Sequence, residues 1–248
     1  MRLDGKSAIV TGGASGFGAG IVRRFVLEGA TVVIADINEA AAMSLADELG
    51  DNATGLKVDV SSAEDVAAMV KASSRVTGAI DILVNNAGVG HVPESMESLS
   101  EENFDRIFEV NIKSIYRTAQ QVVPIMKERG SGAILNMGST GGVSPRPNLT
   151  WYNASKGWVI TATRSMAIEL AGSGVRVNAL NPVAGETPLL KTFMGEDTPE
   201  IRAKFLASIP IGRFSTPEDM GAAACFLCSD DASMITGVAL EVDGGRCI

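Results

Sequence analysis

The 248-residue sequence is poor in the residues that mark disulfide-rich and metal-binding proteins. It has only three cysteines, an odd number, which argues against a disulfide framework. Cys225 and Cys228 are three positions apart in an apolar, helix-like stretch, so we interpret them as packing residues. The only histidine, His91, lies far from them in the sequence, and we expect no metal site.

Positive charge and long hydrophobic runs are also scarce. Lys and Arg number 21 against 29 Asp and Glu, which gives a net charge of −8 and argues against nucleic acid as a main partner. No apolar run approaches the roughly 20 residues that cross a bilayer. Because a strand pattern follows the first few residues without a secretory signal, we expect a cytoplasmic protein with no membrane partner.

The chain is rich in small and aliphatic residues. Apolar residues make up 46% and glycines number 27, while aromatic residues contribute only 5%. This mixture is typical of α/β proteins, in which Val, Ile and Ala fill the strands and the helix faces. We find no internal repeat or linker, so we expect residues 1–248 to form a single domain.

Strand-like and helix-like segments alternate along the chain. We expect strands at 6–12, 30–36, 54–60, 79–88, 132–139, 175–182 and 238–244. We expect helices at 16–28, 38–49, 62–76, 101–128, 150–172 and 217–228. The irregular stretch 183–215, with its Gly, Pro and Thr residues, is the candidate lid. The alternation predicts a doubly wound parallel β-sheet of about seven strands with helices on both faces.

A glycine-rich turn joins the first expected strand to its helix. Such a turn lets a pyrophosphate approach the helix N-terminus, where N–H groups and the helix dipole attract it. The candidate cofactor residues of this turn are Gly12, Ser15, Gly16, Phe17 and Gly18.

The second expected strand ends at Asp36, eighteen residues after Gly18. A carboxylate there can accept hydrogen bonds from the adenosine ribose and would repel a 2′-phosphate, which favours NAD over NADP. Residues 15 and 37 are Ser15 and Ile37, so no basic side chain compensates. Asp59 and Val60 end the third expected strand, where we expect them to lie beside the adenine.

Several short motifs occur in order along nearly the whole chain. They are the TGGASGFG turn, Asn85-Asn86-Ala87-Gly88, Asn111, Ser139, Tyr152-Asn153-Ala154-Ser155-Lys156 and Asn181-Pro182. With them the sequence resembles the short-chain dehydrogenase/reductase family. The resemblance implies a Rossmann-type fold and a hydride transfer between NAD(H) and an alcohol or ketone carbon.

The catalytic roles follow from this resemblance. Tyr152 and Lys156 are four positions apart on an expected helix, so their side chains project from the same face. A phenol has a pKa near 10, and we expect the ammonium and a positive nicotinamide to lower it. The resemblance makes Tyr152 the general acid/base, Ser139 the donor to the substrate oxygen, and Asn111 part of a proton relay. An Asn inside a long helix can equally bond its own backbone.

The resemblance also adds cofactor contacts. It places Asn85, Ala87 and Gly88 against the adenosine side of the cofactor, and Lys156 on the nicotinamide ribose. Pro182 and Thr187 should lie near the nicotinamide. Here the sequence departs from the family pattern, because Val183 follows Pro182 where the family usually has glycine.

The substrate remains open at this point. Our first hypothesis is an NAD-dependent dehydrogenase of a secondary alcohol, polyol or sugar. A 3-oxoacyl-thioester reductase, acting on an acyl-carrier-protein or CoA thioester, is an alternative, but Ala133 and Ser173 stand where carrier-binding arginines are expected. A non-catalytic nucleotide-sensing regulator is a third hypothesis, which the intact Ser, Tyr and Lys oppose.

His91 and Arg146 could line the substrate pocket, but residues of these types in loops are more often ordinary loop residues, which is the reading we favour. The long helices at 101–128 and 150–172 predict, by resemblance, a homotetramer built on paired helix faces.

Overall fold

A computed structural model describes residues 1–248 and contains one seven-stranded, wholly parallel sheet in the order β3-β2-β1-β4-β5-β6-β7. The strands are β1 (Ser7–Thr11), β2 (Thr31–Asp36), β3 (Ala53–Lys57), β4 (Ile82–Asn85), β5 (Gly132–Met137), β6 (Val175–Pro182) and β7 (Ala239–Val242). The order reverses between β1 and β4, which creates the crevice where ligands bind in such sheets. The predicted doubly wound α/β fold is confirmed.

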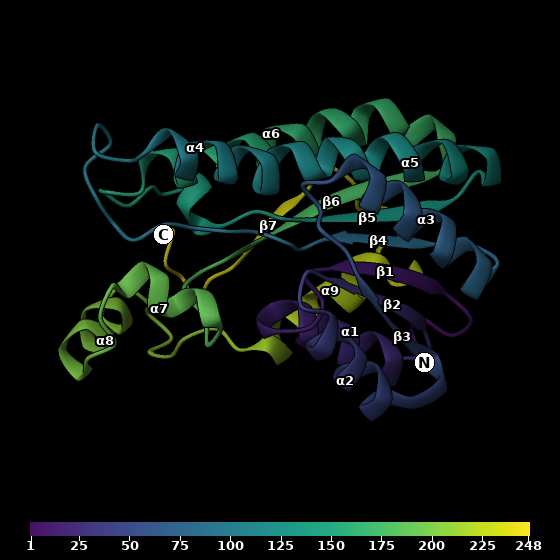
Figure 1. Ribbon diagram of the computed structural model, residues 1–248, viewed down its shortest axis with the longest axis horizontal. Helices are drawn as coiled ribbons and strands as arrows, with labels where there is room; N and C mark the ends of the chain where they lie inside the picture. The colour runs from purple at the N-terminus through teal and green to yellow at the C-terminus, as the bar shows by residue number, and fades with distance from the viewer.

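Helices cover both faces of the sheet (Figure 1). One layer contains α1 (Gly16–Leu27), α2 (Glu39–Leu49) and α9 (Pro217–Cys228), and the other contains α3 (Ala63–Thr77), α5 (Ser114–Arg129) and α6 (Thr150–Leu170). Each layer buries its own apolar cluster against the sheet. The central strands are therefore buried on both faces, as expected for aliphatic strands such as SAIVT in β1.

Side-chain caps start several of these helices. Asn38 accepts a hydrogen bond from Ala41 N before α2, and Ser62 accepts one from Asp65 N before α3. Thr216 forms a capping box with Asp219 at the start of α9. These caps satisfy N–H groups that have no partner within the helix, which fixes where each helix begins.

The predicted helix at 101–128 is not continuous. It consists of α4 (Glu101–Ile107), a π-helical segment (Phe108–Lys113) and α5. The π-helical segment carries Asn111, and widened turns of this kind are frequent at functional sites. The only buried residue of this segment is the polar Asn111, so hydrophobic periodicity does not reveal it.

The stretch 183–215 is also more ordered than we expected. It contains the short helices α7 (Pro188–Met194) and α8 (Pro199–Leu206), each with a threonine at the N-cap and a proline in its first turn. Val183, Leu190, Met194, Ile209 and Phe214 form a separate small apolar core under these helices. The segment is thus a packed cap beside the sheet (Figure 1).

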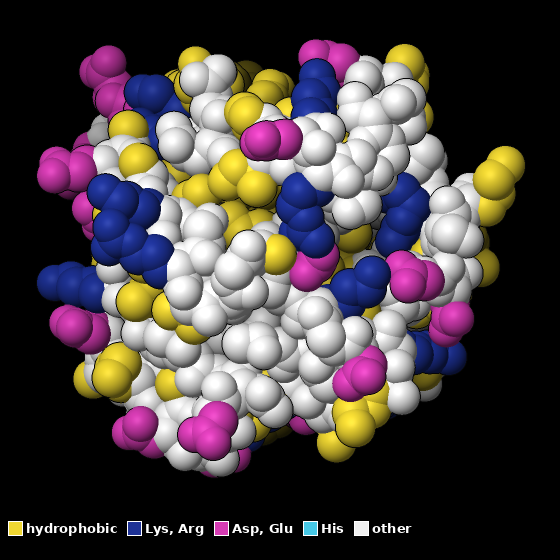
Figure 2. Space-filling view, turned by 90° about the vertical axis from the view of Figure 1, so that its right-hand side faces the viewer, with side chains coloured by type: hydrophobic (Ala, Val, Ile, Leu, Met, Phe, Trp, Pro, Cys, Tyr) yellow, Lys and Arg dark blue, Asp and Glu magenta, His cyan; other side chains and the backbone are white.

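Figure 2 shows the side of the molecule on the right of Figure 1. Basic and acidic side chains are interspersed there, and neither sign forms a continuous patch. Arg129 and Asp81, which flank the beginnings of β5 and β4, form an ion pair with a 2.8 Å N–O distance. No helix of the protein combines the length and apolar character that crossing a membrane requires.

Candidate active site

A cavity of about 1050 Å³ extends along the carboxyl ends of the strands. Its lining comes from the turn before α1, the ends of β2 to β4, the residues after β5 and β6, and α7. The sequence-predicted residues that line it are Gly12, Ser15, Gly16, Phe17, Gly18, Asp36, Ile37, Asp59, Val60, Ala87, Gly88, Ser139, Tyr152, Lys156, Pro182 and Thr187. Residues from distant parts of the chain therefore meet in one cavity.

The glycine-rich turn is packed so tightly that side chains would not fit. A Cβ on Gly18 would lie 2.0 Å from the carbonyl oxygen of Gly12, and one on Gly12 would lie 2.9 Å from Ala87 Cα. Gly12 also has a φ of +59°, which favours glycine. The N-cap residue Ser15 makes no side-chain cap, so the first N–H groups of α1 remain available to an anion.

Asp36 is held in place at the rim of the cavity. Its Oδ2 accepts a hydrogen bond from Ala14 N at 3.0 Å, and its Oδ1 accepts one from Asn38 N at 2.9 Å. These bonds connect the end of β2 to the glycine-rich turn. The carboxylate is therefore fixed beside the turn that would receive a pyrophosphate.

Two neighbouring asparagines at the end of β4 have different surroundings. Asn85 does not line the cavity, because its amide donates to Asn136 Oδ1 at 2.8 Å and accepts from Thr118 Oγ1 at 2.8 Å inside the protein. The Asn85 side chain is thus bonded inside the protein, and the cofactor contact of this residue stays a prediction. Asn86, which the sequence analysis did not select, lines the cavity and donates to the carbonyls of Thr11 and Gly12.

Tyr152 and Lys156 project from α6 into the cavity, and each is only 6% exposed. Lys156 Nζ lies 5.9 Å from the centre of the Tyr152 ring and donates to the carbonyl of Met137 at 2.8 Å. Ser139, directly beyond β5, accepts a hydrogen bond from Gly141 N at 3.0 Å. One helix and one strand end thus bring the three predicted catalytic side chains together.

Burial dominates the proton affinities of this group. It raises the pKa of Tyr152, which a hydrogen bond with Ser139 only partly offsets. It also lowers the pKa of Lys156 to about 8, because the interior disfavours an ammonium ion. Lys156 Nζ donates to the Met137 carbonyl, and the lowering of the Tyr152 pKa by this lysine together with a bound nicotinamide stays a prediction.

Asn111 stands behind the cavity wall. Its Oδ1 accepts from Val89 N at 2.8 Å, and its Nδ2 donates to Val89 O at 3.0 Å and to Ser155 Oγ at 3.1 Å. The side chain therefore connects the π-helical segment to the loop following Gly88 and to α6. It does not bond its own helix, which was the other reading of this residue.

α7 brings a residue to the catalytic group that the sequence analysis missed. The centre of the Phe193 ring lies 4.9 Å from the centre of the Tyr152 ring, and the two ring planes are inclined by 57°. A Cβ on Gly90 would lie 2.6 Å from the Phe193 ring, so the two segments approach closely. Nothing local in the sequence marks Phe193, because this contact joins segments far apart in the chain.

Two further polar side chains at this end of the cavity are incompletely bonded. His91, 6% exposed, has Nδ1 2.9 Å from the Val92 carbonyl, while its Nε2 has no partner. Asn181, in β6, is fully buried and neither end of its amide has a partner.

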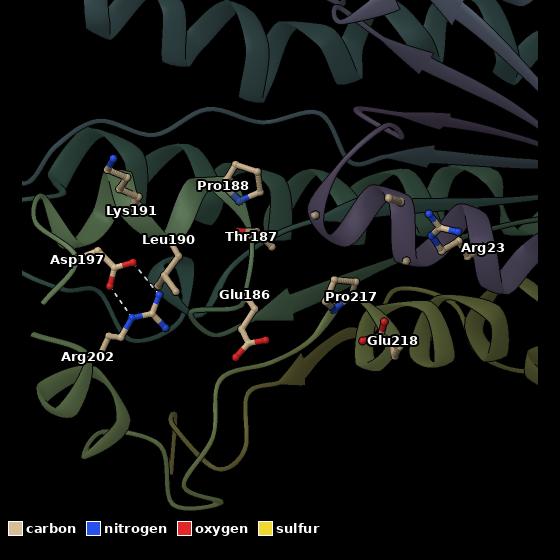
Figure 3. Close-up of a pocket in the computed structure, with 13 residues that line it drawn as sticks. Arg23, Glu186, Thr187, Pro188, Leu190, Lys191, Asp197, Arg202, Pro217 and Glu218 are labelled. Atoms are coloured by element: carbon tan, nitrogen blue, oxygen red, sulfur yellow. Dashed lines mark hydrogen bonds and ion pairs between the residues drawn. The ribbon is translucent and has the colours of Figure 1, made fainter. Parts of the chain in front are cut away.

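A second hollow, of about 690 Å³, adjoins the cavity and lies between the start of α1, α7, α8 and the start of α9 (Figure 3). Glu186, Lys191 and Glu218 face it, and Arg202 pairs with Asp197 at its edge. It contains none of the predicted catalytic side chains.

The cysteines do not form a reactive site. Cys225 and Cys228 are buried in the apolar core, and burial raises the pKa of Cys228 to about 12. No group of three or more His, Cys, Asp or Glu residues is placed to hold a metal ion.

Comparisons with known proteins agree with this geometry. The family described as enoyl-(acyl carrier protein) reductase matches residues 12–246. The chain is 49% identical to 4-formylbenzenesulfonate dehydrogenase of Comamonas testosteroni and 39% identical to 7alpha-hydroxysteroid dehydrogenase of Escherichia coli. The first alignment covers 100% of both chains, and the second covers 99% of this chain and 95% of the relative.

The structural similarity is equally extensive. A 3-ketoacyl-(acyl-carrier-protein) reductase from Brucella melitensis, solved with NADH, superposes with a TM-score of 0.95 at 52% identity, over 99% of this chain and 100% of the other. The chain belongs to the short-chain dehydrogenase/reductase family. It is thus an oxidoreductase of alcohol and carbonyl groups, and its relatives include both dehydrogenases and acyl-carrier-protein reductases.

Proposed function

We propose that the protein is an NAD-preferring dehydrogenase/reductase that interconverts an alcohol with its ketone or aldehyde, with Tyr152 as general acid/base. The observation that carries this proposal is that Ser139, Tyr152 and Lys156 line the same cavity as the glycine-rich turn and Asp36. A nucleotide at the turn and a substrate at the tyrosine would then share one crevice.

The residues of the turn fit a dinucleotide. The lack of side chains at Gly12 and Gly18 keeps this turn compact, and the uncapped start of α1 leaves N–H groups that suit a pyrophosphate group. Asp36 would accept hydrogen bonds from the adenosine ribose and oppose a 2′-phosphate, which favours NAD. Two relatives in this family were solved with NADH.

Each catalytic side chain has a distinct task. When bound, the nicotinamide supplies or accepts the hydride, and its oxidised ring adds a positive charge near the tyrosine. Tyr152 takes the proton of the alcohol during oxidation and returns it to the carbonyl oxygen during reduction. Ser139 donates a hydrogen bond to that oxygen, where negative charge develops.

Lys156 and Asn111 support this proton transfer. A Lys156 side chain with a pKa of about 8 holds a proton at neutral pH and can release it without large cost. Lys156 would also bind the nicotinamide ribose, with Pro182 and Thr187 closing the cavity beyond it. Asn111 positions the Val89 backbone and Ser155. In this way it would support the relay that carries protons from the site to solvent.

Two substrate classes have specific support. The similarity to 4-formylbenzenesulfonate dehydrogenase favours alcohols and aldehydes of small organic molecules. The similarity to the Brucella melitensis reductase and to 3-oxoacyl-[acyl-carrier-protein] reductase of Thermotoga maritima, at 40% identity, favours 3-oxoacyl thioesters. Against the second class, the buried Ala133 and Ser173, which ends the 3-10 turn after α6, are uncharged residues and supply no carrier-binding charge.

The proposal is tested with purified protein and a panel of aromatic aldehydes, alcohols, polyols and acetoacetyl thioesters. Oxidation of NADH or reduction of NAD is followed by absorbance. The same measurements are made with NADPH and NADP at equal concentrations. We expect turnover of a carbonyl substrate with a preference for NADH. Absence of turnover on the whole panel, despite measurable NADH binding, would favour a nucleotide-sensing role.

We also propose a homotetramer. Exposed apolar side chains gather on the outer helices: Phe104, Phe108 and Tyr116 on α4 to α5, and Trp158 and Ile168 on α6. Pairing of these helices between copies would cover them. Light scattering should give four times the 25.8 kDa chain mass, and a monomer would contradict the proposal.

A further inference from the structure

The helix α7 has two different faces. Leu189 and Phe193 line the cavity that contains the proposed catalytic side chains, whereas Leu190 and Met194 belong to the small apolar core. Residues four positions apart lie on the same face of a helix, so one face of α7 packs on this core and the other forms part of the cavity wall. The core therefore fixes the position of the residues that face the cavity.

Phe193 lies at the end of α7 that is remote from the glycine-rich turn. The helix begins beside that turn, because a Cβ on Gly16 would lie 3.0 Å from the Cβ of the N-cap residue Thr187. Phe193 follows Thr187 by six positions, which corresponds to roughly 9 Å along a helix axis. The ring is thus displaced from the expected pyrophosphate site toward the loop that follows β4.

The Phe193 ring packs directly on the proposed acid/base. Phe193 is half-buried, and Tyr152, whose ring it contacts, is only 6% exposed. The hydroxyl end of Tyr152 forms a hydrogen bond with Ser139. Because Phe193 lines the cavity beside Tyr152, a carbonyl whose oxygen binds at these two hydroxyl groups would have its attached carbon group next to the Phe193 ring.

Gly90, in the loop after β4, leaves the space that the Phe193 ring occupies. A Cβ at position 90 would lie 2.6 Å from Cε1 and 2.9 Å from Cζ of Phe193, which form the tip of the side chain. Gly90 does not have a positive φ, so its backbone conformation suits alanine as well as glycine. The obstacle to a side chain at this position is therefore the ring, and an added methyl group would push the ring aside.

We propose that Phe193 is a specificity-determining residue, whose ring packs on the flat aromatic group of the substrate while the attached carbonyl reacts at Tyr152. The inference rests on the proposed function and specifies its substrate class as aromatic aldehydes and the corresponding alcohols. Aromatic rings attract one another in tilted and offset arrangements beyond the effect of area burial. A puckered, saturated ring of the same size is thicker and lacks this attraction.

The test compares benzaldehyde with cyclohexanecarbaldehyde, which has the same number of carbon atoms, using NADH. In Phe193→Ala the ratio of kcat/KM for benzaldehyde over cyclohexanecarbaldehyde should fall about 3- to 10-fold from the wild-type ratio. Phe205→Ala is the matched control: Phe205 in α8 packs on the same small core beneath Arg146, and neither residue lines the cavity. An equal fall in both variants would assign the effect to a loosened cap segment and overturn the proposal.

Gly90→Ala tests the same contact without removing the ring. The added methyl group should displace Phe193 and lower the ratio, although the side chain of Phe193 is unchanged. In the double variant Gly90→Ala/Phe193→Ala, the glycine substitution should add nothing, because the ring that it displaces is absent. A further fall as large as that in Gly90→Ala alone would show that Gly90 does not act through Phe193.

Binding of benzamide and cyclohexanecarboxamide, which keep the carbonyl but do not react, gives a readout that needs no turnover. Calorimetry with excess NADH should show tighter binding of benzamide by the wild type. This advantage should disappear in Phe193→Ala at an unchanged melting temperature, and equal affinities in the wild type would overturn the proposal.

The two measurements also separate this proposal from the proposed function. If no aldehyde is reduced but the benzamide advantage depends on Phe193, the oxidoreductase function fails and the aromatic contact stands. If both aldehydes are reduced with the same ratio in the wild type and in Phe193→Ala, the function stands and the assignment of Phe193 is wrong.

Discussion

The nucleotide end and the catalytic end of the cavity are built in contrasting ways. At the nucleotide end, polar side chains are satisfied by the protein itself: Asp36 accepts from Ala14 and Asn38, and Asn86 donates to Thr11 and Gly12. At the catalytic end, Asn181 has no hydrogen-bond partner, His91 Nε2 has none, and Lys156 is buried with a lowered pKa.

This difference indicates that the nucleotide end is built for binding and the catalytic end for chemistry. Internal hydrogen bonds make the nucleotide end rigid before any ligand arrives, which reduces the entropy lost on binding. The catalytic end instead keeps costly buried polar groups, and such groups lower stability while they serve chemistry. Substitutions at the two ends should therefore have opposite effects on stability and different effects on activity.

Tyr152→Phe should produce the largest effect. Without the phenolic hydroxyl no group at this position exchanges a proton with the substrate, so kcat/KM should fall by about 10³-fold or more. The affinity for NADH, measured by fluorescence titration, should change only a few-fold because the nucleotide end is intact. Activity close to wild type would show that another residue is the acid/base.

Lys156→Met should abolish activity but stabilise the fold. The unfolded lysine binds its proton up to a pKa of 10.5 and the folded one only up to about 8, so the native state is penalised by about 3 kcal/mol below pH 8. Wild-type stability should rise between pH 8 and 10.5 as this penalty disappears.

Urea unfolding of wild type and Lys156→Met at pH 7 and pH 10 measures this effect. The variant should be more stable than the wild type at pH 7. It should also lack the increase in stability between pH 8 and 10.5 that Lys156 gives the wild type. Its gain is smaller than the full penalty because the hydrogen bond to the Met137 carbonyl is lost. A variant less stable than wild type at pH 7 would show that this bond outweighs the burial of the charge.

Asp36→Asn should have a smaller effect, limited to cofactor choice. Removal of the negative charge should shift the ratio of kcat/KM for NADPH over NADH upward by roughly 10-fold, because a 2′-phosphate is no longer repelled. Asp59→Asn is the matched control: Asp59 also lines the cavity, and its Oδ1 accepts from Ser61. An equal shift in both variants would assign the effect to overall charge.

Much of the fold could be predicted from the sequence. Alternating aliphatic strands and helical segments gave the parallel sheet, because a strand buried on both faces needs a continuous apolar run such as TVVIAD in β2. The glycine-rich turn was equally visible, since only glycine fits where a Cβ would meet the Gly12 carbonyl. The spacing of Tyr152 and Lys156 placed both on one face of α6 for the same local reason.

Other features were decided only by tertiary structure. Asn85 and Asn86 are identical residues in sequence, yet one bonds Asn136 and Thr118 while the other lines the cavity. The pKa of Tyr152 rises because burial outweighs nearby hydrogen bonding, and burial depends on what packs above the ring, including Phe193. Hydrogen-bond partners and desolvation are set by residues that are distant in the chain. Backbone conformation and helical spacing are set by neighbouring residues, so they are the properties that a sequence shows locally.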